Sequence, residues 1–227
     1  MTAKENAPRM LSRHIATARK RSASSARWLN RQINDPYVAM AKKDGYRARS
    51  AYKLIELNEK FGFLKPGKRV VDLGAAPGGW TQIAVKEVCS KPEKPLVVGL
   101  DLLEMDPVPG AKTTQLDFLD DRAPDVLKEM LDGHKADVVL SDMAPNTTGT
   151  PSVDHLRIMG LVETAFAFAC EILNENGTFV AKVFQGGTEQ TLLAEMKKRF
   201  ATVKHAKPPA SRKESAEFYV VAQGFRG

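Results

Sequence analysis

The chain has 227 residues, of which 43% are hydrophobic and 27% are charged, a composition that suits one domain with a buried core. No apolar run approaches the roughly 20 residues of a membrane-spanning helix, and the N-terminus lacks the apolar stretch of a secretory signal. We therefore expect a cytoplasmic, monomeric protein without a membrane partner. The two cysteines and four histidines lack metal-ligand spacing, so no metal site is expected.

The net charge of +7 is concentrated near the N-terminus. Of the 34 basic and 27 acidic residues, residues 1–53 hold 13 Lys or Arg but only Glu5, Asp35 and Asp44, which leaves 21 against 24 in the rest. Lys and Arg neutralise phosphates, so this region predicts a nucleic-acid partner, with a solvated basic tail as the alternative. Residues 1–25 lack persistent apolar periodicity and predict a disordered basic tail, although their Arg-rich composition also resembles a mitochondrial transit peptide.

Two helices are predicted next. Asp35 and the proline after it suit the start of a short helix, and apolar spacing predicts a second helix over residues 49–60. We interpret residues 26–66 as a basic helical extension that contacts the nucleic acid, and residues 67–227 as the α/β core. The basic residues expected to meet nucleic-acid phosphates are Arg47, Arg49 and Lys53.

Strands and helices then alternate along the chain. Strands are predicted at residues 69–73, 96–100, 113–116, 136–141, 178–184, 202–206 and 218–223, and helices at 80–88, 123–131, 155–173 and 189–199. This order predicts an α/β, doubly wound, seven-stranded Rossmann-like sheet, in a single domain over residues 26–227. The link between the last two strands is too short for a crossover helix, so we expect them to pair antiparallel at an edge.

A glycine-rich turn follows the first predicted strand. Residues 70–80 read VVDLGAAPGGW, in which Gly74 and Gly78 would let the backbone approach a ligand. The spacing differs from the dinucleotide fingerprint G-x-G-x-x-G, because Ala75 and Ala76 follow Gly74 directly. The turn therefore favours a nucleotide-like cofactor other than NAD, and a plain strand-to-helix turn is the alternative.

Carboxylates lie at the ends of four of the predicted strands, at the edge where an open α/β sheet binds its ligand. They are Asp72, Asp101, Asp117 and Asp142. Four carboxylates would repel one another unless a cation or several donors lay among them, and S-adenosylmethionine (SAM) supplies a sulfonium, an amino group and a ribose diol. Lys182 lies in an otherwise apolar strand, where a buried lysine is uncommon and a snorkelling edge lysine is the alternative.

Several motifs carry a resemblance to a known family. Residues 74–80 (GAAPGGW), 141–146 (SDMAPN) and 182–186 (KVFQG) resemble the FtsJ family of ribosomal RNA ribose methyltransferases, and residues 21–29 and 215–220 also fit it. The resemblance implies a SAM-dependent methyltransferase that modifies the ribose 2′-hydroxyl of a uridine in 23S ribosomal RNA, in the assembled 50S subunit. A transfer RNA ribose methyltransferase and a non-catalytic ribosome-assembly protein that binds RNA are the alternatives.

The resemblance also implies site residues. A catalytic tetrad maps onto Lys53, Asp142, Lys182 and Glu217, and SAM contacts onto Gly78, Trp80, Asp101, Asp117 and Asp142, to which the glycine turn adds Asp72 and Gly74. Lys182 is the candidate general base for in-line attack of the ribose oxygen on the methyl group. A lysine that keeps its proton would instead orient the hydroxyl and stabilise developing negative charge. Lys53 and Glu217 are expected to orient the ribose and Lys182.

Overall fold

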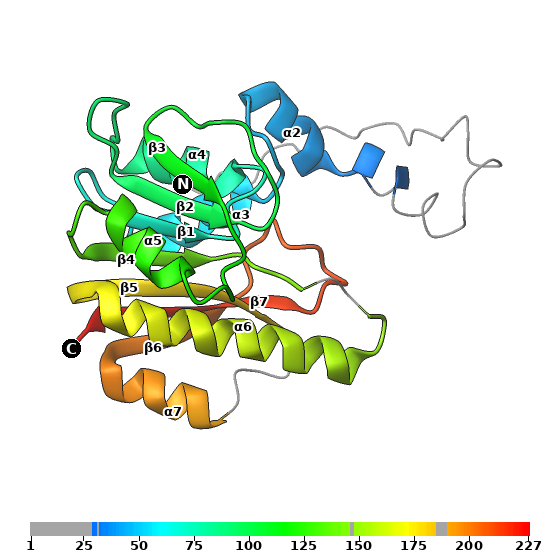
Figure 1. The fold of residues 1–227 in the computed structure, drawn as a ribbon. Helices are drawn as coiled ribbons and strands as arrows, with labels where there is room; N and C mark the ends of the chain where they lie inside the picture. Colours follow the sequence, from blue (N-terminus) through cyan, green and yellow to red (C-terminus); the bar gives the residue numbers. More distant parts are fainter. Residues whose placement is uncertain (1–28, 31, 146–147, 185–189) are drawn as a thin grey trace, which may run out of the picture.

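The computed structural model describes residues 29–30, 32–145, 148–184 and 190–227 (Figure 1). The expected tail over residues 1–25 and motif positions 146, 185 and 186 lie outside the described residues. The elements run in the order α2 (Pro36–Asp44), α3 (Ala51–Phe61), β1 (Val70–Leu73), α4 (Gly79–Glu87), β2 (Val97–Asp101), β3 (Ala111–Gln115), α5 (Ala123–Met130), β4 (Ala136–Ser141), α6 (Pro151–Ile172), β5 (Leu173–Phe184), α7 (Gln190–Arg199), β6 (Phe200–Ala206) and β7 (Glu217–Phe225). In this part of the chain, no helix combines the length and apolarity that a bilayer crossing demands.

A seven-stranded sheet forms the centre of the described chain, with the order β3-β2-β1-β4-β5-β7-β6 (Figure 1). The strand order reverses between β1 and β4, which are parallel, and such a switch point is where open α/β sheets bind ligands. β7 runs antiparallel to both β5 and β6. The doubly wound sheet and the antiparallel pairing of the last two strands are therefore confirmed, with β6 at the edge and β7 inside the sheet.

The bounds of β5 and α6 differ most from those predicted. Both elements begin earlier than expected, and β5 starts at Leu173, which pairs with Ala136. The pairing shifts register before Val138, and Asn176 has a positive φ of 63°. Asn176 therefore lies in an irregular part of the strand pair, between Leu173 and Thr178.

The two faces of the sheet are covered by different helices. Helices α5, α6 and α7 pack on one face, against side chains that include Val71, Val139 and Phe179. Helices α3 and α4 pack on the other face, against side chains that include Val70, Val138 and Val180. Because strand side chains alternate between faces, Asp72 and Lys182 lie on the α3/α4 face, two residues after Val70 and Val180, and Tyr219 belongs to the same core.

Candidate active site

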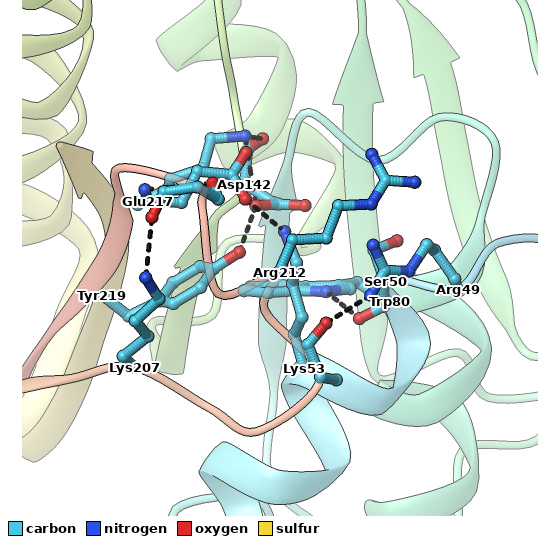
Figure 2. Close-up of polar contacts among 12 residues, drawn as sticks. Arg49, Ser50, Lys53, Trp80, Asp142, Lys207, Arg212, Glu217 and Tyr219 are labelled. Atoms are coloured by element: carbon cyan, nitrogen blue, oxygen red, sulfur yellow. Dashed lines mark hydrogen bonds and ion pairs between the residues drawn. The ribbon is translucent and has the colours of Figure 1, made fainter. Parts of the chain in front are cut away.

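A buried carboxylate, amine and phenol meet at the carboxyl edge of the sheet. Lys182 is 6% exposed, and its Nζ lies 2.6 Å from the carbonyl oxygen of Asp142 and 3.2 Å from Asp142 Oδ1. Tyr219 pairs with Lys182 across β5 and β7, and its hydroxyl donates to the same Oδ1 at 2.7 Å (Figure 2). Asp142 therefore holds two neighbouring donors in place, each from a different strand.

The other two tetrad residues form an ion pair beside this group. Lys53, from α3, lies 2.8 Å from Glu217, the first residue of β7, with side chains 10% and 29% exposed (Figure 2). Burial opposes ionisation of Glu217, but the positive charges of Lys53 and Lys182 hold the pKa of Glu217 below its ordinary value. The Lys53 Nζ also lies 5.8 Å from the centroid of the Tyr219 ring. The structure thus brings all four predicted tetrad residues together.

Tyr219 is the residue that sequence reasoning missed. It is fully buried, and burial together with the Asp142 carboxylate raises the pKa of its hydroxyl well above the ordinary value. The phenol therefore stays a hydrogen-bond donor to Asp142. Its position two residues after Glu217, on the same face of a strand, is the sequence signal that could have found it.

Asp72 is the most deeply buried carboxylate at the carboxyl edge of the sheet. It is fully buried, its Oδ2 accepts from the Thr81 hydroxyl at 2.7 Å, and its Oδ1 has no hydrogen-bond partner in the described structure. Burial raises the pKa of Asp72 to about 7, with a further contribution from Asp142 and Asp101, whereas the Thr81 hydrogen bond opposes the shift. An unpartnered buried oxygen is available to a ligand that brings a donor.

The next two carboxylates lie nearer the surface. Asp101 is partly exposed, and its oxygens accept from the backbone N–H groups of Ala76 at 2.9 Å and Leu103 at 2.8 Å. Asp117 is exposed and accepts from the N–H of Leu119 at 3.0 Å. Each carboxylate oxygen can accept more than one hydrogen bond, so both side chains can still bind a hydroxyl or an amine.

The glycines of the turn make room for protein atoms. Gly74 and Gly78 have positive φ values of 80° and 109°. A Cβ at Gly74 would lie 2.9 Å from Met143 Cγ, and one at Gly78 would lie 2.8 Å from Arg47 Nη1. Any side chain at either position would strain the turn, both through φ and through contact. The neighbouring protein atoms thus explain why both positions of the turn are glycine. Direct contact of these glycines with a cofactor remains a prediction.

Trp80 is a core residue of the α3/α4 face. It is 3% exposed, and its Nε1 donates to the carbonyl oxygen of Ser50 at 2.9 Å (Figure 2). Its ring centroid lies 5.5 Å from that of Tyr219. Trp80 therefore connects the start of α3 to Tyr219, whose hydroxyl bonds Asp142. A direct contact of Trp80 with the cofactor remains a prediction.

Charged residues of the helical extension line a cavity next to the tetrad. Arg49 lies 3.1 Å and Arg212 lies 3.2 Å from the same oxygen of Asp35, whose other oxygen caps α2. Together with Lys53 and Glu217, both arginines line a cavity of about 360 Å³. Asp35 therefore fixes two guanidinium groups in the lining of this cavity.

The chemistry of the edge fits SAM. Asp72, Asp101 and Asp117 provide acceptor oxygens at successive strand ends, and SAM brings an ammonium group and ribose hydroxyls as donors. Among the described residues, no group of three or more His, Cys, Asp or Glu could hold a metal ion. The doubly wound sheet, with these acceptor oxygens and the Lys-Asp-Lys-Glu cluster at its carboxyl edge, indicates the class of SAM-dependent methyltransferases.

Comparison with known proteins narrows this class. The FtsJ-like methyltransferase family matches residues 46–225, and the chain belongs to that family. Ribosomal RNA large subunit methyltransferase E of Paramagnetospirillum magneticum is 65% identical over 221 residues, covering 96% of this chain and 90% of the relative. The protein of the same name from Rhodopseudomonas palustris (strain BisB5) is 60% identical over 213 residues, covering 94% and 90%. A Plasmodium falciparum structure described as a ribosomal RNA methyltransferase is 33% identical with a TM-score of 0.70, covering 80% of this chain and 100% of that one.

Proposed function

We propose that this chain transfers the methyl group of SAM to the ribose 2′-hydroxyl of a uridine in 23S ribosomal RNA, in the assembled large subunit. The observation that carries the proposal is the cluster of Lys53, Asp142, Lys182 and Glu217 at the carboxyl edge of the sheet. Two relatives that share at least 60% identity bear the name of a large-subunit ribosomal RNA methyltransferase. Among nucleic acids, the 2′-hydroxyl is present only in RNA.

Lys182 is the group that would meet the acceptor oxygen. SAM supplies a methyl group on a sulfonium, open to in-line attack by an oxygen. The Lys182 amine donates to the carbonyl oxygen of Asp142 and forms an ion pair with Asp142 Oδ1, and a protonated amine has three N–H groups, so it could still donate to the 2′-oxygen. Asp142 binds the amine and Tyr219 holds Asp142 in place, which fixes the direction from which the hydroxyl would be bound. Alignment of the reacting atoms is where such a site gains most of its rate.

The cavity beside the tetrad supports the placement of the acceptor nucleotide. Its lining includes Arg49 and Arg212 together with the Lys53–Glu217 pair. Guanidinium groups bind phosphates through several fixed donors, and Lys53 would orient the ribose between the phosphate and Lys182. We assign residues 26–66 to RNA contact within a single, monomeric methyltransferase domain over residues 26–227.

Large subunits from cells that lack the protein provide the test of substrate. The purified full chain, given radiolabelled SAM, is expected to methylate these subunits, and mapping of 2′-O-methyl groups should find one new site in 23S RNA. Free 23S RNA and transfer RNA are the comparison substrates. Methylation of transfer RNA but not of subunits would overturn the proposed substrate, and binding to subunits without transfer would point to an assembly protein.

Variants of Lys182 test its role. Lys182→Ala is expected to abolish transfer while SAM binding, measured by calorimetry, stays close to that of the original protein. Lys182→Arg keeps N–H donors but cannot accept a proton near neutrality, so residual transfer in this variant favours the orienting role over the general base. Lys198→Ala, at an exposed position on α7, is the matched control. Full activity of Lys182→Ala would remove this lysine from the mechanism.

A further inference from the structure

One arginine of the helical extension connects two loops at the cofactor edge. Arg47 lies between α2 and α3, and its Nη1 donates to the carbonyl oxygens of Pro77 at 3.3 Å and Asp106 at 2.5 Å. Its Nη2 donates to the carbonyl oxygen of Pro107 at 2.7 Å. Pro77 belongs to the turn between β1 and α4, whereas Asp106 and Pro107 belong to the loop between β2 and β3. A single guanidinium group therefore joins two segments that approach the site from different strands.

Both ends of Arg47 are held in place. Its backbone N–H donates to Gln82 Oε1 at 2.9 Å, and Gln82 Nε2 donates to the carbonyl oxygen of Gly45 at 3.1 Å, so α4 fixes the segment that carries the arginine. The guanidinium lies against Gly78, where a Cβ would be 2.8 Å from Nη1 and 3.1 Å from Met105 Cε. The absence of a side chain at Gly78 is thus what allows Arg47 to reach both loops.

The two loops that Arg47 joins carry predicted SAM contacts. The turn after β1 holds Gly74 and Gly78, and the loop after β2 follows Asp101. Asp101 already ties the loops at one point, because its Oδ2 accepts from the N–H of Ala76 at 2.9 Å. Arg47 supplies a second tie farther along both loops, so their separation is set at two points.

We propose that Arg47 is a positioning residue for SAM, which holds the β1–α4 turn and the β2–β3 loop at the separation that the cofactor needs. The inference rests on the proposed function and adds to it a role for the helical extension in binding the methyl donor. Three carbonyl oxygens accept from its two terminal nitrogens, a geometry that a planar guanidinium provides and a single ammonium does not. The partners of Arg47 in the structure are therefore backbone carbonyl oxygens, whereas the sequence predicts that this residue contacts a phosphate.

Arg47→Ala and Arg47→Lys in the full chain test the proposal. In both variants, the Kd for SAM by calorimetry should rise by about tenfold or more, and the KM for SAM should rise with it. At saturating SAM, kcat should change by less than about threefold, because the tetrad is untouched. Gln82→Ala, which removes the anchor on α4, should weaken SAM binding in the same direction. Lys43→Ala, at an exposed position of α2, is the matched control and should leave SAM binding unchanged.

Binding to large subunits at several salt concentrations separates the two roles of Arg47. The positioning role predicts an unchanged salt dependence in Arg47→Ala, whereas loss of a phosphate contact would reduce the slope of log K against log salt by about one. A reduced slope with unaltered SAM affinity would overturn the inference. If Arg47→Ala does not fold by circular dichroism, Arg47→Lys and Gln82→Ala decide the question by the same criteria. An original protein that neither binds SAM nor methylates RNA would instead refute the proposed function.

Discussion

Replacing Asp72 by asparagine should remove a loss of folding stability that grows as the pH rises. Burial raises the pKa of this carboxyl to about 7, from 3.8 in an unperturbed aspartate. Between these two values, the folded chain keeps a proton that the unfolded chain has released. The contribution of Asp72 to stability is therefore present at low pH and is lost as the pH rises toward 7.

The magnitude follows from the size of the shift. One pKa unit corresponds to about 1.36 kcal/mol, and the linkage relation gives a loss of about 2 kcal/mol between pH 5 and pH 7 for this group. The asparagine side chain of the variant would not titrate, and its amide oxygen can still accept from Thr81. The free energy of unfolding of Asp72→Asn, relative to the original protein, should therefore increase by about 2 kcal/mol over the same interval.

Urea unfolding of the full chain at pH 5, 6, 7 and 8 measures this difference. Thr81→Val is the companion variant, because it removes the hydrogen bond that stabilises the ionised carboxylate. Its stability should fall more steeply with pH than that of the original protein, and the fall should continue above pH 7. A constant free-energy difference between Asp72→Asn and the original protein across this range would refute the reasoning.

Three further substitutions test the contacts of the site. Tyr219→Phe removes the hydroxyl that donates to Asp142. In a steady-state transfer assay, this variant should lower kcat by about tenfold or more with little change in SAM affinity. An unchanged kcat would mean that the phenol serves packing alone. A double-mutant cycle of Lys53→Met and Glu217→Gln should give a coupling energy of about 1 kcal/mol in urea unfolding, and additive effects would contradict the ion pair. Asp35→Ala should lower the unfolding free energy by about 2 kcal/mol or more, because it removes a helix cap and leaves two arginines without their carboxylate. A loss below about 0.5 kcal/mol would contradict that account.

The sheet and much of the site could be predicted because both follow from local patterns. Alternation of strands and helices fixes a doubly wound fold, and the carboxyl ends of parallel strands meet at one edge. Asp72 and Lys182 could be assigned to this edge from the strands that carry them. The pairing of Lys53 with Glu217 joins residues 164 positions apart, and only the family resemblance indicated it.

Contacts between loops were beyond prediction from sequence. The glycine turn predicts close approach of a ligand, whereas the atoms that the structure places against Gly74 and Gly78 come from Met143 and Arg47. Basic residues in an extension read as phosphate ligands, yet Arg47 binds three backbone carbonyls. Neither partner could be identified, because each lies in a distant segment with no periodic pattern.

The position of β7 inside the sheet decides when this site can form during synthesis. β7 is the last strand of the sheet in chain order, yet it lies between β5 and β6 and brings Glu217 and Tyr219 to the carboxyl edge. The nascent chain can build β1 to β5 and the helices around them first, since N-terminal segments leave the ribosome earlier. Asp142 then lacks the hydroxyl of Tyr219, and Lys53 lacks its carboxylate. The site therefore reaches its full geometry only when β7 has inserted between β5 and β6.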